Sequence, residues 1–114
     1  MRIYLLVVSR YPCYYIIVIQ NFKTKGTEDI FNGINSRDAR RTCSETVWRM
    51  AARKLDQIDS VESINELRIP PGNRLEELTG DRRGQYSIRI NDQYRICFLW
   101  TDSGPDRVEI VDYH

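Results

Sequence analysis

The stretch of residues 80–100 constrains the fold of this chain most, because its residue pattern predicts a β-hairpin. Apolar residues two positions apart alternate with polar ones, which is typical of a strand with one buried face; they are Tyr86, Ile88 and Ile90. Asn91-Asp92 supplies turn residues that tolerate positive φ, and Tyr94–Trp100 is predicted to return as the second strand. The pattern therefore places Arg89 and Arg95 on strands.

Helical patterns precede the hairpin. Val18–Lys25 has the composition of a first strand, and Thr27–Phe31 that of a helical turn that ends at Asn32-Gly33. A long helix is predicted over residues 36–58 because apolar residues recur there at three- and four-residue steps. The members of this stripe are Cys43, Val47, Met50, Ala51, Leu55 and Ile58.

Turn signals separate the long helix from the hairpin. Asp59–Glu62 has the pattern of a capping box for a short helix through Leu67, and Pro70–Asn73 that of a turn. Short strands are predicted at Arg74–Leu78 and, after the hairpin, at Arg107–Asp112.

The order of these elements predicts an α+β fold. Helices that are segregated from a run of strands pack on one face of the sheet. We therefore expect a small antiparallel β-sheet packed against one long and one or two short N-terminal helices. The other sheet face is then partly open, and a ligand can bind there.

Length and composition indicate a single small domain without a metal or membrane signature. The chain has 114 residues, a net charge of +1, and 17 basic residues of which only three are lysines. Its three cysteines show no CxxC spacing and only one histidine is present, which argues against zinc and for a reducing compartment.

Residues 1–17 are interpreted as an N-terminal extension outside the domain, which would span residues 18–114. Arg10 and Pro12 interrupt the apolar run, so it is too short for a transmembrane helix. The run is also not followed by the small residues of a signal-peptide cleavage site. These patterns favour a cytoplasmic protein without membrane contact.

Four arginines are candidates for phosphate binding. Arg82 and Arg83 lie on a loop between glycines, where they are either solubilising turn residues or RNA contacts. Arg89 and Arg95 either pair across strands with acids such as Glu109 or Asp112, or form a guanidinium cluster that binds phosphate. The residue pattern alone leaves both interpretations open.

The chain ends on three polar residues that are capable of proton transfer, Asp112, Tyr113 and His114. A terminal histidine is ordinarily solvated and inert. This one directly follows a predicted strand, and the neighbouring α-carboxylate favours a protonated imidazole. No P-loop or dinucleotide fingerprint is present.

Three segments in a fixed order resemble the HigB-type toxins of the RelE/ParE toxin–antitoxin superfamily, the plasmid maintenance system killer family. They are LRIPPGNRLEEL at residues 67–78, GDRRGQYSIRINDQYRI at residues 80–96 and VDYH at residues 111–114. The resemblance covers residues 18–114. It implies a RelE-like fold and the toxin of a type II toxin–antitoxin system.

The resemblance also implies an activity, a ribosome-dependent mRNA endonuclease that needs no metal or cofactor. In this chemistry the ribose 2′-OH attacks the adjacent phosphate, leaving a 2′,3′-cyclic phosphate and a 5′-OH. Arg95 would stabilise the phosphate, Asp112 and His114 would share proton transfer, and Tyr113 would position the nucleotide. Arg82, Arg83 and Arg89 would bind RNA.

The implied partners are the ribosome with its mRNA and a HigA-like helix-turn-helix antitoxin, through which alone the toxin would reach operator DNA.

Two departures from the family pattern are Thr79 and Glu76, where related toxins often have a basic residue and a histidine. Two alternatives stay open. One is a ParE-like toxin that inhibits DNA gyrase without nuclease chemistry, and the other is an inactive, antitoxin-binding relic.

Overall fold

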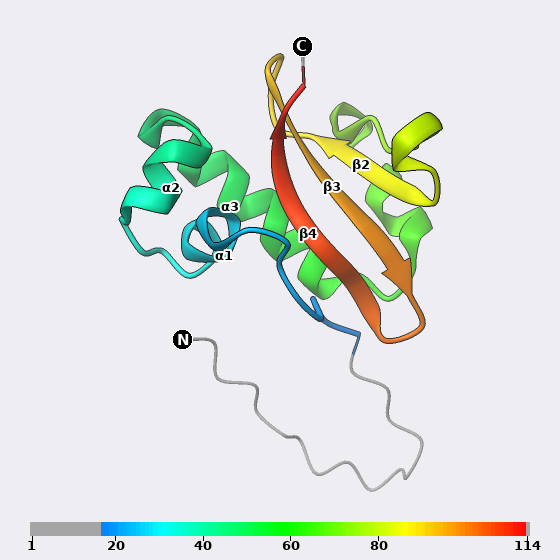
Figure 1. Ribbon diagram of the computed structural model, residues 1–114. Helices are drawn as coiled ribbons and strands as arrows, with labels where there is room; N and C mark the ends of the chain where they lie inside the picture. Colours follow the sequence, from blue (N-terminus) through cyan, green and yellow to red (C-terminus); the bar gives the residue numbers. More distant parts are fainter. Residues whose placement is uncertain (1–16, 114) are drawn as a thin grey trace, which may run out of the picture.

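The computed structural model describes residues 17–113 and has an α+β architecture, with helices packed on one face of a twisted antiparallel sheet (Figure 1). The sheet has four strands in the order β1-β2-β3-β4, and it confirms the predicted fold class. The strands are β1 (Glu76–Glu77), β2 (Gln85–Arg89), β3 (Tyr94–Thr101) and β4 (Gly104–Asp112). The helices are α1 (Lys25–Phe31), α2 (Arg37–Thr42) and α3 (Glu45–Ser60), with 3-10 turns at Ile64–Arg68 (η1), Pro71–Asn73 (η2) and Gly80–Arg82 (η3).

The predicted hairpin is confirmed by β2 and β3. Ile88 pairs with Ile96, and Arg89 lies directly opposite Arg95. The Asn91 side chain forms the turn, because its Oδ1 accepts hydrogen bonds from the backbone N–H groups of Gln93 and Tyr94 at 2.9 and 2.7 Å. The following strand, predicted from residue 107, already begins at Gly104.

The predicted long helix is wrong in one respect, because the chain breaks it into α2 and α3. Cys43 has an extended backbone, and the Ser44 side chain accepts a hydrogen bond from Thr46 N at 3.4 Å as the N-cap of α3. Serine hydroxyls favour such caps over helix interiors. Met50 is also misplaced by the predicted stripe, because 49% of that residue is exposed while Ala51, Leu55 and Ile58 form the buried face of α3.

The first predicted strand, Val18–Lys25, is also wrong. The segment lies extended beside β4 and forms only an isolated bridge between Phe22 and Val108. Two of its hydrogen bonds to β4 run from Gln20 N to Pro105 O and from Lys23 N to Val108 O. Because Thr24 caps α1, the helix begins at the last residue of the predicted strand.

The connection between α3 and β2 is less regular than predicted. Residues 59 and 60 continue α3, and the capping interaction lies further along, where Glu66 accepts from the backbone N–H groups of Glu62 and Ser63. The predicted strand over residues 74–78 is reduced to the two residues of β1. The expected end of α1 at Asn32-Gly33 is confirmed, and Gly33 has a φ of 73°.

The hydrophobic core lies between α3 and one face of the sheet, with α1 and α2 closing one end (Figure 1). Alternation along the strands supplies its sheet side, and the apolar stripe of α3 supplies the other. The central members are Ala51, Leu55, Ile58, Ile88, Ile96, Phe98 and Val108. No helix within residues 17–113 is long and apolar enough to cross a membrane.

The contact between α1 and α2 depends on Gly26. A Cβ at this position would lie 1.9 Å from Thr42 Oγ1 and 2.4 Å from the Asp38 carbonyl oxygen. Alanine normally stabilises a helix by up to about 1 kcal/mol relative to glycine. Here we expect Gly26→Ala to lower the free energy of unfolding by about 1–2 kcal/mol, because overpacking costs more than the propensity gain.

Urea denaturation measures this effect. Gly72→Ala is the matched control, since a Cβ there meets nothing within 4 Å and the variant should unfold like the original chain. Equal stability of the two variants would contradict the close packing of α1 on α2.

Candidate active site

The sheet face opposite α3 is polar but not fully open. Strand alternation assigns Ser87, Arg95 and Glu109 to this face, and each is buried. Cys97 lies on the same face, and burial raises the pKa of its thiol. Buried polar groups require hydrogen-bond or ion-pair partners, so the arrangement of this face follows from which partner each buried side chain contacts.

Arg95 is held in the sheet by neutral acceptors. Its Nε donates to Ser87 Oγ at 2.8 Å, and its Nη2 donates to the Arg74 carbonyl oxygen at 2.6 Å. Glu76 Oε2 lies 3.9 Å from the same Nη2, but Glu76 is exposed, so solvent screens this pair. Only 8% of Arg95 is accessible, and its Nη1 makes no hydrogen bond to the residues that the structure describes.

Arg82 lies over Glu109 at the edge of the same face. It is the last residue of η3, and its Nη1 donates to Glu109 Oε1 at 2.8 Å and to Gln85 Oε1 at 3.1 Å. The Glu109 hydrogen bond raises the pKa of Arg82. Lys23 reaches the same carboxylate oxygen at 3.4 Å, so two cations neutralise one buried acid.

Tyr113 is positioned by the hairpin turn. Its backbone N–H donates to the Gln93 carbonyl oxygen at 2.6 Å, which holds the end of the chain beside the β2–β3 turn. Its ring lies over the Arg95 guanidinium, with Cζ 5.8 Å from the ring centroid. The side chain is 42% exposed and therefore presents an aromatic surface next to two arginines.

Two pockets meet at Arg82 and Tyr113. One, of about 330 Å³, is lined by Glu76, Glu77, Leu78, Thr79, Asp81, Arg82 and Tyr113. The other, of about 570 Å³, is lined by Arg82, Val111, Asp112 and Tyr113. Because three carboxylates line the first pocket and one lines the second, a phosphate is favoured only on the side where Arg82 and Tyr113 meet.

Asp112 contributes to the second pocket, but its carboxylate accepts a hydrogen bond from Gln93 Nε2 at 3.1 Å. It pairs with Tyr94 across the strands, so alternation directs it to the face opposite Arg95. The strand register therefore places the predicted acid and the predicted phosphate stabiliser on opposite faces of the sheet. His114 lies outside the described residues.

The remaining predicted arginines lie elsewhere. Arg83 is exposed on the turn after η3 and lines neither pocket. Arg89 is directly opposite Arg95 in the sheet, yet it ion-pairs with Asp92 and lines a separate pocket against α3. Neither Arg89 nor Arg95 pairs with Glu109 or Asp112, the cross-strand partners considered from the sequence.

The sequence did not indicate two contacts that position the site. One is the contact of Ser87 with Arg95, and the other is the contact of Glu109 with Arg82. Ser87 looks like an outward polar residue of a strand, although the structure buries it completely. The only signal for it is a small hydroxyl directly across the hairpin from the position of Cys97. The Arg82–Glu109 contact joins residues 27 positions apart and has no local pattern.

Comparison with known proteins identifies the family. The model of the RelE-like toxin of the type II toxin–antitoxin system HigB matches residues 20–114. The chain belongs to the HigB-like toxin family. Toxin HigB-1 of Vibrio cholerae is 40% identical over 81 residues, which cover 71% of this chain and 82% of that protein.

Two further proteins are similar to this HigB-like chain. An uncharacterized protein of Haemophilus influenzae is 39% identical over 66 residues, covering 58% of this chain and 65% of the relative. Among solved structures, a chain of the YoeB-YefM complex from Staphylococcus aureus is similar with a TM-score of 0.47 and 17% identity. That match covers 89% of this chain and 98% of the other.

The two departures from the family pattern both line the smaller pocket. Thr79 and Glu76 lie in its wall together with Arg82. An uncharged residue at 79 and a carboxylate at 76 make this wall more anionic than a lysine or arginine and a histidine would. Arg82 is the one cation among the residues that line this pocket.

The position of Arg95 depends on Ser87. We expect Ser87→Ala to lower the free energy of unfolding by about 1–3 kcal/mol, because it leaves the buried Arg95 Nε without its acceptor. Urea denaturation followed by circular dichroism measures the loss. Ser103→Ala is the control, because Ser103 is an exposed turn residue that contributes its carbonyl rather than its hydroxyl. A Ser87 variant as stable as this control would contradict the assigned contact.

Proposed function

We propose that this HigB-like toxin is a ribosome-dependent mRNA endonuclease that cleaves by metal-free attack of a ribose 2′-OH on the adjacent phosphate. The observation that carries the proposal is the meeting of a guanidinium and an exposed aromatic ring, Arg82 and Tyr113, where two pockets join. Single-stranded RNA is recognised through stacking on aromatic rings and through cations at its phosphates. Membership of the HigB-like toxin family is consistent with this chemistry.

The two central arginines have different roles in this proposal. Arg95 is buried and uses Nε and Nη2 to bind the sheet, so it contributes fixed positive charge, and Nη1 is its one donor without a partner among residues 17–113. Arg82 is half-buried and lines both pockets, where it contacts the phosphate and stabilises the charge that develops on it. Tyr113 stacks on the base beside the scissile bond.

Proton transfer is assigned to carboxylates and to the terminal histidine. Asp112, at the larger pocket, and His114 share the roles of base and acid, as in the family resemblance. Glu76 is a further carboxylate in the wall of the smaller pocket, 3.9 Å from the Arg95 guanidinium. Its position suits activation of a 2′-OH that is drawn toward that guanidinium. Arg83 and Arg89 bind RNA outside the pockets.

The toxin's partner is proposed to be a HigA-like helix-turn-helix antitoxin. The antitoxin binds the toxin and prevents cleavage, and it alone contacts operator DNA. Support comes from the family, which is that of a type II toxin–antitoxin system.

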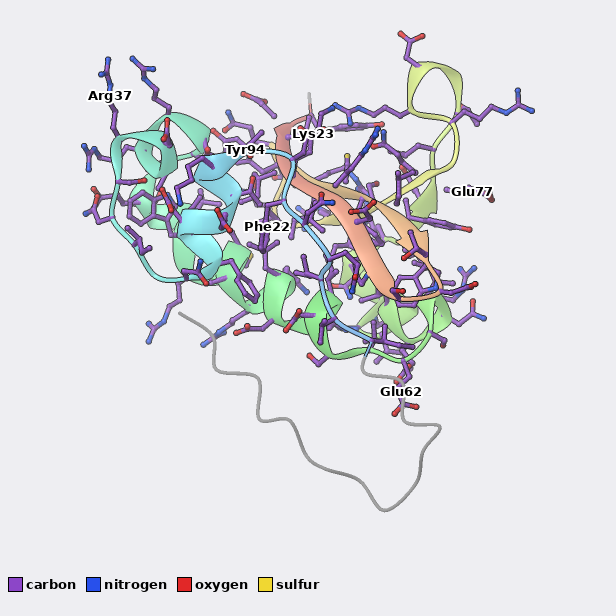
Figure 2. All side chains as sticks on the ribbon, turned by 60° about the horizontal axis from the view of Figure 1, so that its bottom comes forward. Phe22, Lys23, Arg37, Glu62, Glu77 and Tyr94 are labelled. Carbon is purple, nitrogen blue, oxygen red and sulfur yellow. The ribbon has the colours of Figure 1, made fainter. Side chains whose placement is uncertain are left out.

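The test is induced expression followed by mapping of 5′ ends on translated mRNA. We expect Arg82→Gln to lower the cleavage rate by about 100-fold, because one preorganised donor to the charged phosphate is lost. Arg37→Gln is the matched control, because it also removes one positive charge, from the exposed start of α2. Figure 2 shows Arg37 on the opposite side of the molecule from Glu77, which lines the smaller pocket.

Reactions with purified ribosomes test the chemistry separately. Cleavage should persist in EDTA-treated mixtures that retain intact ribosomes, and it should stop when the ribose at the cut site carries 2′-H. Intact messages together with trapped gyrase–DNA breaks would replace the nuclease by the gyrase-directed alternative. Absence of any toxicity without antitoxin would identify an inactive relic.

A further inference from the structure

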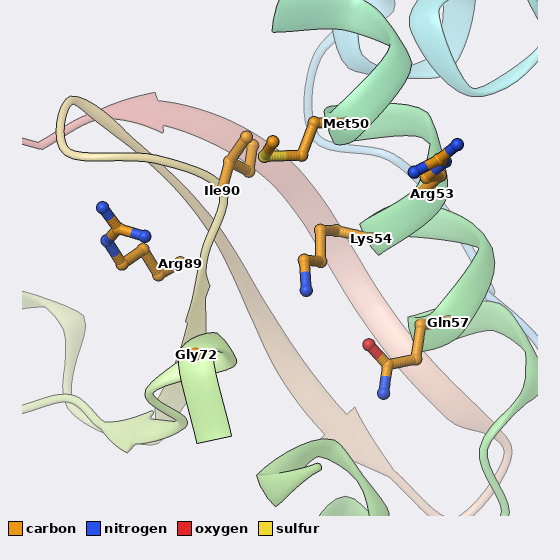
Figure 3. Close-up of a pocket in the computed structure, with 7 residues that line it drawn as sticks. All are labelled: Met50, Arg53, Lys54, Gln57, Gly72, Arg89 and Ile90. Carbon is orange, nitrogen blue, oxygen red and sulfur yellow. The ribbon is translucent and has the colours of Figure 1, made fainter. Parts of the chain in front are cut away.

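A third pocket, of about 380 Å³, lies between α3, η2 and the end of β2 (Figure 3). It is separate from the two pockets at Arg82 and Tyr113 and shares no lining residue with them. In Figure 3, Lys54 and Gln57 extend from α3 toward η2, whereas the Arg89 side chain lies on the other side of β2 and extends away from Lys54. The complete lining consists of Met50, Arg53, Lys54, Gln57, Gly72, Arg89 and Ile90.

Lys54 is held at this pocket by a buried amide. Its Nζ donates to Oδ1 of Asn73, a residue with no exposed surface. Asn73 is itself fixed, because its Nδ2 donates to Gln57 Oε1 at 3.0 Å and to the Leu67 carbonyl oxygen at 3.1 Å. The ammonium group is therefore preorganised, and among the residues that the structure describes only one of its three N–H donors has a partner, which leaves two for a ligand.

The pocket has more positive charge than its own residues neutralise. Three of its lining residues are cations and none is an acid. Within residues 17–113, neither Lys54 nor Arg53 forms an ion pair, whereas Arg89 pairs with the fully exposed Asp92. Burial lowers the pKa of Lys54, which is the effect of desolvation on an ammonium without a nearby carboxylate. An anion in the pocket would supply the missing countercharge.

The pocket and the candidate active site are linked through the sheet. Arg89, which lines the pocket, lies directly opposite Arg95, which supports the candidate active site. Directly opposed side chains on neighbouring strands are about 5 Å apart at Cβ. A flexible chain of regularly spaced phosphates can therefore extend from one site to the other, which favours RNA over a separate acidic protein segment.

We propose that this pocket binds a backbone phosphate of the RNA whose scissile bond lies between Arg82 and Tyr113. Lys54 contacts the phosphate directly, Arg53 and Arg89 complete its charge, and Ile90 with Met50 packs against the sugar. The choice of RNA rests on the proposed function, whereas binding of a phosphate anion does not.

Inorganic phosphate is the first probe, titrated into the full chain and followed by NMR at constant ionic strength against chloride. We expect saturable shifts at the amides of Arg53, Lys54 and Gly72. The double variant Arg53→Gln/Lys54→Gln should weaken phosphate binding at least about tenfold, since each charged hydrogen bond contributes roughly 1.5 kcal/mol or more. The control Arg37→Gln/Arg107→Gln removes the same charge from exposed positions outside the pocket and should bind phosphate normally.

The single variant Arg53→Gln keeps the Lys54–Asn73 contact and replaces the double variant if that one unfolds. It should weaken phosphate binding severalfold. Shifts confined to the surroundings of Arg82 and Tyr113, or equal affinity in pocket and control variants, would overturn the site itself.

A 2′-O-methyl oligoribonucleotide, which cannot be cleaved, is the second probe. Its affinity should fall in the pocket variant, and the slope of log affinity against log salt should become shallower by about 0.7, the value for one lost phosphate contact on a single strand. An unchanged slope together with displacement of phosphate by a poly-glutamate peptide would overturn RNA as the occupant. Failure of the nuclease proposal would leave inorganic phosphate binding intact, so the two results can be told apart.

Discussion

The burial of Arg95 in the sheet is the interaction on which the rest of the site depends. A guanidinium removed from water needs acceptors for its donors, and Ser87 together with the Arg74 carbonyl oxygen supplies them for Nε and Nη2. These contacts hold β2, β3 and the segment before β1 against one another. Tyr113 then lies over the guanidinium, so the end of the chain is positioned by a charge within the sheet.

A second buried charge, Glu109, organises the other side of the same face. It accepts from Arg82 and lies near Lys23, which brings the η3 turn and the extended N-terminal segment onto β4. Breaking one partner of such a group leaves an uncompensated buried charge. Arg82 is therefore both a structural cation and the half-buried cation that lines both pockets. A phosphate that binds Arg82 must share it with Glu109.

The charge distribution separates two kinds of surface on this small HigB-like toxin. The pocket that contains Thr79 and Glu76 is rich in carboxylates, which suits proton transfer but opposes a phosphate except beside Arg82. The pocket on α3 has the opposite composition, with cations and no acid. In the proposed complex, an RNA uses both pockets, with its reacting bond near the carboxylates and a further backbone phosphate at Lys54.

Local patterns in the sequence determined the hairpin, its turn, the end of α1 and the overall α+β class, because strand alternation and Asn or Gly turn chemistry act over a few residues. The same patterns misplaced the long helix at Ser44, where a serine cap competes with an apolar stripe that continues through it. The resemblance in residues 67–114 indicated the family, which the comparison with known proteins confirmed.

Only the tertiary structure decided which groups Arg82 and Arg95 contact. The contacts of Arg82 with Glu109 and of Arg95 with Arg74 span 27 and 21 residues, so no local periodicity encodes them. It also separated Asp112 from Arg95, because one step along a strand changes the face of the sheet. Residue types with charge were visible in the sequence, but their burial, their partners and the pocket beside Lys54 depend on the packing of distant elements.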